Sequence, residues 1–132
     1  MRESFDPREI VVLEGPPRPP PSPAARPGEI RLLDESTDHM TLEVDAPDAA
    51  ILLITDSYAS GWRARALPGS VQSDYWLQPA NYTLRAVPLA AGRHRLVVEY
   101  APTAFRAGKW VSSLSALVFL GAVAHAWGRT RR

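Results

Sequence analysis

The sequence predicts a mainly β fold: a small antiparallel β-sandwich of about seven or eight strands, followed by a single C-terminal transmembrane α-helix. Three observations support this prediction. Short segments in which apolar and polar residues alternate recur between turn residues, proline is concentrated in one early stretch, and a long uncharged stretch lies near the C-terminus. At 132 residues and 14.5 kDa, the chain is long enough for one small domain and one membrane span.

The N-terminal part divides into a short segment, residues 1–14, and a proline-rich connector, residues 15–28. Within the segment, the stretch EIVVL at 9–13 predicts a short strand. The connector reads GPPRPPPSPAARPG, and proline lacks the backbone donor that a β ladder requires. We therefore expect an extended, partly polyproline connector, with an SH3-type ligand as the alternative because PxxP spacing occurs here.

Residues 29–102 carry the signals of the β-sandwich. In the stretch 37–46, alternate apolar residues share one face, as in a half-buried strand: Met40, Leu42, Val44 and Ala46. The stretch AAILLIT at 49–55 is continuously apolar and predicts a strand covered on both faces. Further strands are expected at 63–67, at 82–87 and at 94–100, between turns rich in proline and glycine.

The stretch WVSSLSALVFLGAVAHAW at 110–127 predicts the membrane-spanning helix. None of its eighteen residues is Asp, Glu, Lys or Arg. As a helix it would be about 27 Å long, close to the ~30 Å hydrocarbon thickness of a bilayer. The alternative is a buried helix of a soluble domain, but its apolar residues would form one stripe, whereas here they surround the helix. We place the transmembrane helix at 106–128 and a basic tail at 129–132.

Tryptophan and basic residues flank this stretch on both sides. Their side chains combine an apolar body with a polar tip, which favours the membrane–water interface. The predicted interface anchors are Arg106, Lys109, Trp110, Trp127, Arg129, Arg131 and Arg132.

The net charge of +1 hides an uneven distribution. Residues 1–56 contain twelve acids and five arginines, whereas residues 57–132 contain ten bases and two acids. Because the balance is close to neutral, we predict no nucleic-acid partner. Charge pairing between strands is the simpler interpretation of the two halves, and a basic half near anionic headgroups is the alternative.

No catalytic or metal-ligating constellation is recognisable, so we predict no enzyme activity, no cofactor and no metal site. Cysteine is absent, which excludes disulfides and thiolate chemistry. The histidines, His39, His94 and His125, lie far apart in the sequence. Patterns typical of a nucleophile elbow, a P-loop or a dinucleotide fold are also absent.

Aromatic residues suggest an alternative function, because flat rings stack on sugars. A carbohydrate- or glycolipid-binding surface would use Tyr58, Trp62, Tyr75 and Trp76 as exposed rings aligned on one face. The simpler interpretation is that these aromatics fill a small core.

Two motifs follow each other in the second half of the chain. An aliphatic strand is followed by D-x-Y-x-x-G-W-x-A at 56–64, and NYTLRAVPLAAGRH at 81–94 is followed by RLVVEYAP and the apolar stretch. This order resembles the C-terminal region of YfhO-family bacterial membrane proteins, which are related to C-superfamily glycosyltransferases. The segment SFDPREIVVLEGPP at 4–17 resembles the family's segment just before the sandwich, so the resemblance covers nearly the whole chain.

The resemblance implies an extracytoplasmic β-sandwich that sits on the membrane, followed by the last transmembrane helix. The catalytic acid of such proteins lies in a loop near their beginning, which this chain does not contain, so no catalytic role is carried over. The chain departs from the family at LPGS (67–70) and in the longer stretch 71–80. A shared binding role for Tyr75 and Trp76 is therefore not implied.

We thus expect a non-catalytic module that docks on a larger integral-membrane protein or complex, as an accessory subunit or as the detached C-terminal part of a YfhO-like protein. The expected location is the bacterial inner membrane, with the sandwich periplasmic and the C-terminus cytoplasmic. The chain begins MRESFDPREI, without an apolar signal region. Three explanations stay open: a separated end of a longer product, a start further upstream, or a tail-anchored protein with a cytoplasmic sandwich.

Overall fold

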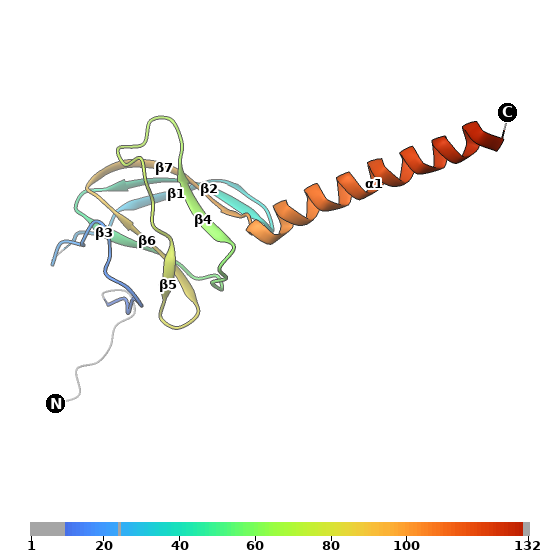
Figure 1. The fold of residues 1–132 in the computed structure, drawn as a ribbon. Coiled ribbons are helices and arrows are strands. Elements are labelled where there is room, and N and C mark those ends of the chain that lie inside the picture. Colours follow the sequence, from blue (N-terminus) through green and yellow to red (C-terminus); the bar gives the residue numbers. More distant parts are fainter. Residues whose placement is uncertain (1–9, 24, 131–132) are drawn as a thin grey trace. The chain divides into compact units, whose positions relative to one another are not determined.

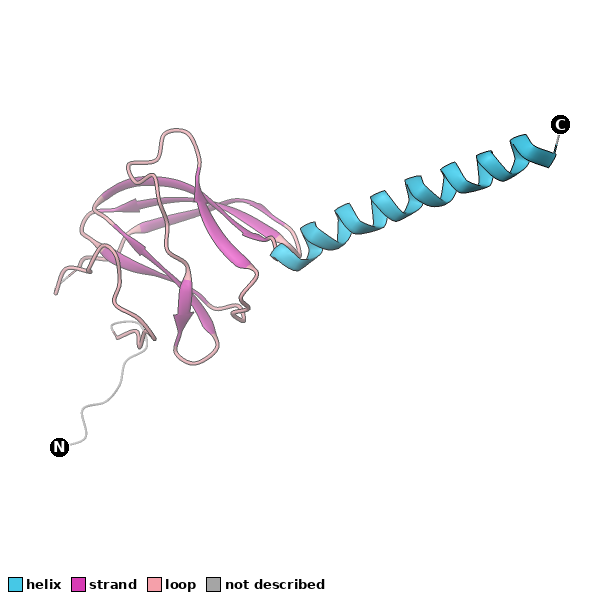
Figure 2. Cartoon of the chain, viewed as in Figure 1, coloured by secondary structure: helices cyan, strands magenta, loops and turns pink. Residues whose placement is uncertain are grey.

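The computed structural model describes residues 10–23 and 25–130, with side chains left undescribed at 103–107, 124, 128 and 130. This described part contains seven strands and one helix, which form two separate units, residues up to Tyr100 and residues from Ala101 onward (Figures 1 and 2). The elements are β1 (Glu29–Glu35), β2 (His39–Ala46), β3 (Ala50–Ile54), β4 (Trp62–Ala66), β5 (Gln78–Ala80), β6 (Leu84–Leu89), β7 (Gly92–Tyr100) and α1 (Thr103–Thr130). The predicted fold class is confirmed.

The strands form two antiparallel sheets. One sheet has four strands in the order β1-β2-β7-β4, and the other has three in the order β3-β6-β5. The chain crosses between the sheets after β2, β3, β4 and β6, whereas β5 and β6 form a hairpin within one sheet.

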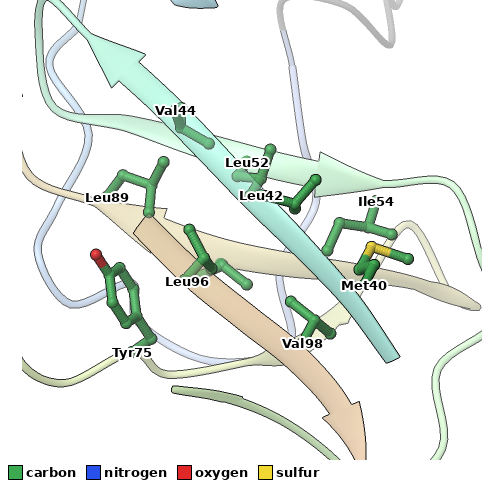
Figure 3. Close-up of a cluster of buried hydrophobic side chains, with 10 residues drawn as sticks. Met40, Leu42, Val44, Leu52, Ile54, Tyr75, Leu89, Leu96 and Val98 are labelled. Atoms are coloured by element: carbon green, nitrogen blue, oxygen red, sulfur yellow. The ribbon is translucent and has the colours of Figure 1, made fainter. Parts of the chain in front are cut away.

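The core lies between the two sheets (Figure 3). The four-stranded sheet contributes Met40, Leu42 and Val44 from β2 and Leu96 and Val98 from β7, and β3 and β6 supply the opposing side chains Leu52, Ile54, Val87 and Leu89. The predicted alternation of β2 is confirmed, because its even-numbered residues from Met40 to Ala46 are buried. Cross-strand pairing with β7 fixes the register, in which Leu42 lies opposite Leu96.

The prediction that the strand at 49–55 is covered on both faces is wrong, and the strand buried on both faces is β6, which overlaps the stretch expected to alternate. In β3, Leu52 and Ile54 are buried while the residues beside them remain partly exposed. In β6, every residue from Arg85 to Leu89 is buried. The three-stranded sheet has β6 at its centre, so side chains on both faces of this strand are covered, whereas β3 lies at an edge.

The N-terminal segment packs on the sandwich but is not the strand expected at 9–13. Residue 9 lies outside the described residues, and Leu13 forms only an isolated bridge with Ala80. Val12 exchanges hydrogen bonds with Asn81: its N–H donates to the side-chain oxygen at 2.9 Å, and its carbonyl accepts from the Asn81 N–H at 2.8 Å.

The proline-rich connector, residues 15–28, contains no strand in its described part, as predicted, and it is held at two points. The Ser22 N–H donates to the Ala49 carbonyl at 2.8 Å. The Arg26 guanidinium lies 2.9 Å from the Asp48 carboxylate, and this pairing raises the pKa of Arg26 and lowers that of Asp48. The connector is thus anchored at the turn between β2 and β3.

The strand predicted at 82–87 begins later, at Leu84, because Asn81 and Tyr82 form the tip of the β5–β6 hairpin. Their φ angles are 46° and 72°, in the left-handed region that tight hairpins require. Asparagine tolerates this conformation, whereas tyrosine adopts it rarely. The sequence signal missed β5 itself, because Gln78–Ala80 is short and contains a proline.

Helix α1 begins at Thr103 and ends at Thr130, slightly beyond the predicted 106–128 at both ends. Its stretch Gly108–Trp127 is long and apolar enough to cross a membrane, and none of it is buried against other described residues. Ser113 and Ser115 donate hydrogen bonds to the carbonyls of Lys109 and Val111, at 2.8 and 2.9 Å. The hydroxyls are therefore satisfied within the helix itself.

Replacing Leu96 by alanine should lower the free energy of unfolding by about 2–5 kcal/mol, because a fully buried side chain leaves a cavity between the sheets. Urea unfolding of the full chain in detergent micelles measures the change. The matched control is Leu32→Ala on β1, where the side chain is 53% exposed and the cost should stay below about 1 kcal/mol. Equal costs at both positions would contradict this placement of the core.

Candidate functional site

The long connection between β4 and β5 is held to β7 by a chain of side-chain hydrogen bonds. The Tyr75 hydroxyl donates to Nδ1 of His94 at 2.7 Å, and Nε2 of His94 donates to the Ala90 carbonyl at 2.8 Å. Ser70 contacts the same Tyr75 hydroxyl and accepts from the Arg95 N–H at 3.1 Å. Because a carbonyl oxygen only accepts, the His94 proton lies on Nε2. Every donor in this series of hydrogen bonds then has an acceptor.

This chain of hydrogen bonds is buried. His94 is 0% exposed and Tyr75 is 5% exposed, with their rings edge to face at 5.8 Å. Burial raises the pKa of the Tyr75 phenol, although the Ser70 hydroxyl opposes the change. A buried polar network with all its members paired fixes one packing arrangement. Tyr75 therefore has a structural role, and its use as an exposed glycan-stacking ring was wrongly predicted.

A second polar cluster lies where β4 begins and β7 ends. The Arg85 guanidinium lies over the Trp62 ring, 3.8 Å from its centroid, and 3.0 Å from the Asp56 carboxylate. The Trp62 ring also meets that of Tyr100, at 5.4 Å between centroids. Arg85 is 3% exposed, and burial lowers its pKa while Asp56 opposes the change. A buried cation thus gains a carboxylate and an aromatic face as partners.

Among the described residues, three buried donor atoms lack an acceptor. They are Nε and Nη1 of Arg85 and Nε2 of Gln78. The two side chains lie on opposite faces of the three-stranded sheet, since Arg85 pairs with Pro79 and Gln78 pairs with Ala86. They therefore do not converge on one ligand.

The predicted glycan-stacking residues do not form one surface. Trp62 lies near the end of β7, whereas Tyr75 contacts His94 near its beginning, about 20 Å away along the strand. Trp76 is 62% exposed, and Tyr58 is partly exposed. Since Tyr75 is buried and Arg85 covers one face of Trp62, the expected row of four free rings is not present.

The outer face of the four-stranded sheet carries most of the ion pairs. Glu43 on β2 lies 3.4 Å from Arg93 and 3.7 Å from Arg95 on β7. On the other side of β7, Glu99 lies 2.9 Å from Arg63. Glu43 of the first half thus meets two bases of the second half across paired strands, as in the simpler interpretation of the charge asymmetry, whereas Glu99 and Arg63 both belong to the second half. A shallow polar recess on this face is lined by Glu29, Arg31, Glu43, Val44, Asp45 and Arg93.

His39, at the start of β2, lies between two carboxylates. Its Nδ1 is 2.9 Å from Asp38, and its Nε2 is 3.0 Å from Asp34. The hydrogen bond with Asp38 contributes most to raising the pKa of His39 above 6.5, followed by that with Asp34. The pKa of Asp38 is lowered by the same contact. Within the described residues, no group of three or more potential ligands is placed to hold a metal ion.

The predicted interface anchors lie on α1 or just beyond it. Lys109, Trp110, Trp127 and Arg129 are exposed on the helix. The side chain of Arg106 and residues Arg131 and Arg132 lie outside the described part, so their prediction stays open. Trp110 and Trp127 are the last aromatic residues at either end of the apolar stretch, 79% and 65% exposed.

No protein-family model, curated protein or solved structure matches this chain.

Replacing Tyr75 by phenylalanine should lower the free energy of unfolding by about 1–3 kcal/mol, because it leaves Nδ1 of buried His94 without a donor. Urea unfolding measures this cost. Tyr82→Phe is the matched control, since the Tyr82 side chain is 94% exposed and the cost there should be near zero. A cost-free Tyr75→Phe would mean that the buried chain of hydrogen bonds does not form.

The pKa of His39 should lie above 6.5 in the folded chain, as measured by NMR titration with the signal assigned through His39→Gln. Because folding raises the pKa of His39, its interaction with the carboxylates stabilises the fold when His39 is protonated. This stabilisation is complete at pH values below the pKa of His39 in the unfolded chain, and it is lost as the pH rises through its pKa in the folded chain. Asp38→Asn should lower the pKa, whereas Glu35→Gln, at a position without a contact to His39 in the structure, should leave it unchanged. A folded value at or below 6.5 would refute the arrangement.

Proposed function

We propose that the chain is a non-catalytic, membrane-anchored β-sandwich module that docks on a larger integral-membrane protein. The observation that carries this proposal is the helix Gly108–Trp127, whose apolar side chains are exposed on all sides. In water such a surface is costly, whereas in a bilayer it is stable. The helix follows the last strand after only two residues, so the sandwich is tied closely to the span.

The exposed edge of the sandwich supports the docking part of the proposal. Strand β1 is an edge strand of the four-stranded sheet, and all its residues are exposed. Ile30 and Leu32 lie opposite Val44 and Leu42, on the apolar face of the four-stranded sheet, but they are 57% and 53% exposed. The facing sheet has one strand fewer and leaves them uncovered. An apolar strand edge of this kind is suited to a protein partner.

The two sequence motifs support a relationship with the C-terminal region of YfhO-family proteins. Asp56 and Trp62 belong to the first motif and Arg85 to the second, and at one end of the sandwich buried Arg85 contacts exposed Asp56 and partly buried Trp62. His94, the last residue of the second motif, belongs to the other buried network. In this proposal the motifs maintain the fold and contain no reacting group. The location proposed is the bacterial inner membrane, with a periplasmic sandwich.

The docking proposal is tested by extracting the tagged full chain from native membranes in a mild detergent and measuring its size by native electrophoresis. We expect a complex much larger than the 14.5 kDa chain in its micelle. The double variant Ile30→Arg/Leu32→Arg should remain in the membrane fraction but lose the complex, because charges replace the apolar edge. Trp76→Arg, at an exposed position outside β1, is the matched control and should keep it.

A wild-type chain that runs as a stable monomer would contradict docking. A double variant that keeps the complex would contradict the assignment of the docking surface to β1.

A further inference from the structure

The tip of the β5–β6 hairpin is a fully exposed tyrosine in an unfavourable backbone conformation. Tyr82 is 94% exposed and has a φ of 72°, where glycine is the favoured residue. The side chain makes no hydrogen bond or ring contact among the described residues. Packing within the sandwich therefore does not explain a tyrosine here, and such an outlier indicates a role outside the fold.

The hairpin tip is held firmly in place. Asn81 is bonded to Val12 both through its backbone N–H and through its side-chain oxygen. On the other side, the Tyr58 N–H donates to the carbonyl of Thr83 at 2.6 Å. Tyr82 thus projects from a supported turn, visible in Figure 1 as the loop that joins β5 to β6.

This tip lies at the end of the sandwich where β7 ends. Arg85, next to the tip on β6, lies over Trp62, and Trp62 pairs with Tyr100, the last residue of β7. Tyr58 joins the same end through Thr83. Four aromatic residues therefore lie at this end of the sandwich: Tyr58, Trp62, Tyr82 and Tyr100. Tyr82 and Tyr100 are the most exposed of them, at 94% and 45%.

The covalent chain brings this end close to the bilayer. Two residues separate Tyr100 from the start of α1, and the candidate span begins at Gly108. Two extended residues and the first helical turns keep Tyr100 within about 15 Å of the start of the candidate span, whereas the other end of β7 is about 27 Å from Tyr100 along the strand. Tyrosine favours the headgroup layer, where its ring meets apolar chains and its hydroxyl meets water.

We infer that Tyr82 inserts into the phospholipid headgroup layer and orients this end of the sandwich on the bilayer. The inference rests on the proposed membrane anchoring. Tyr82 contributes an amphipathic contact that a glycine at this turn would not provide. A contact with a protein partner at this site is the competing explanation, and it predicts that the tip stays in water when the chain is reconstituted alone.

Because the chain has no cysteine, single spin labels test this directly. The full chain is reconstituted into phosphatidylcholine vesicles with a nitroxide at Thr83→Cys, Ala91→Cys or Leu117→Cys. Collision rates are measured with oxygen, which concentrates in the bilayer, and with a water-soluble nickel chelate. We expect the Leu117→Cys label to be shielded from nickel, the Ala91→Cys label at the opposite end of the sandwich to be fully accessible, and the Thr83→Cys label to be intermediate.

Changing Tyr82 in the Thr83→Cys background tests the side chain itself. Tyr82→Gly suits the left-handed backbone and so preserves the fold, and it should raise nickel access to the level of the Ala91→Cys label. Tyr82→Trp keeps an interfacial ring and should preserve the shielding. Circular dichroism and the urea midpoint verify that each variant is folded.

The possible results separate the two proposals. If the Leu117→Cys label is accessible to nickel, the membrane anchoring fails and the inference about Tyr82 fails with it. If the Leu117→Cys label is shielded but the Thr83→Cys label is as accessible as the Ala91→Cys label, only the inference about Tyr82 is overturned. If Tyr82→Gly leaves nickel access at the Thr83→Cys label unchanged, the inference about Tyr82 is overturned as well.

Discussion

The burial of apolar side chains between two unequal sheets is the constraint on which the structure depends. Leu96 and Val98 on β7 lie opposite β2 side chains within one sheet and pack against Leu52 and Val87 of the other. Because this interface sets the register of β2 and β7, it decides which charged residues meet on the outer face. The same inequality leaves β1 without a facing strand, so the exposed apolar side chains of β1 follow from the way the core is built.

Polar groups close the two ends of the core in different ways. At the beginning of β7, the Tyr75–His94 pair satisfies its donors and acceptors and fastens the β4–β5 connection. At the end of β7, Arg85 is covered by Trp62 and paired with Asp56. Both arrangements draw residues from distant parts of the sequence, and the fully paired Tyr75–His94 network fixes a single packing where apolar contacts alone would tolerate several.

In the function that we propose, the buried polar groups belong to the fold. Among the described residues, buried Arg85, His94 and Tyr75 each contact neighbouring protein groups, although two donor atoms of Arg85 lack an acceptor. Besides the charged outer face of the four-stranded sheet, the exposed surfaces include three that are apolar or aromatic: the β1 edge, the hairpin tip and the helix Gly108–Trp127. Such surfaces suit a lipid bilayer and a protein embedded in it, which is the setting that we propose for this chain.

The sequence alone determined the fold class, the alternation of β2 and the apolar helix, because each depends on local periodicity and composition. It missed β5, which is short and contains a proline, and it predicted a strand at 9–13 where Leu13 forms only an isolated bridge. It also misplaced the doubly covered strand, since coverage depends on which strand takes the centre of a sheet. The aromatic residues show the same limit. Whether Tyr75 is buried or Tyr82 exposed was decided only by tertiary packing, which brought His94 to one ring and left the other at a hairpin tip.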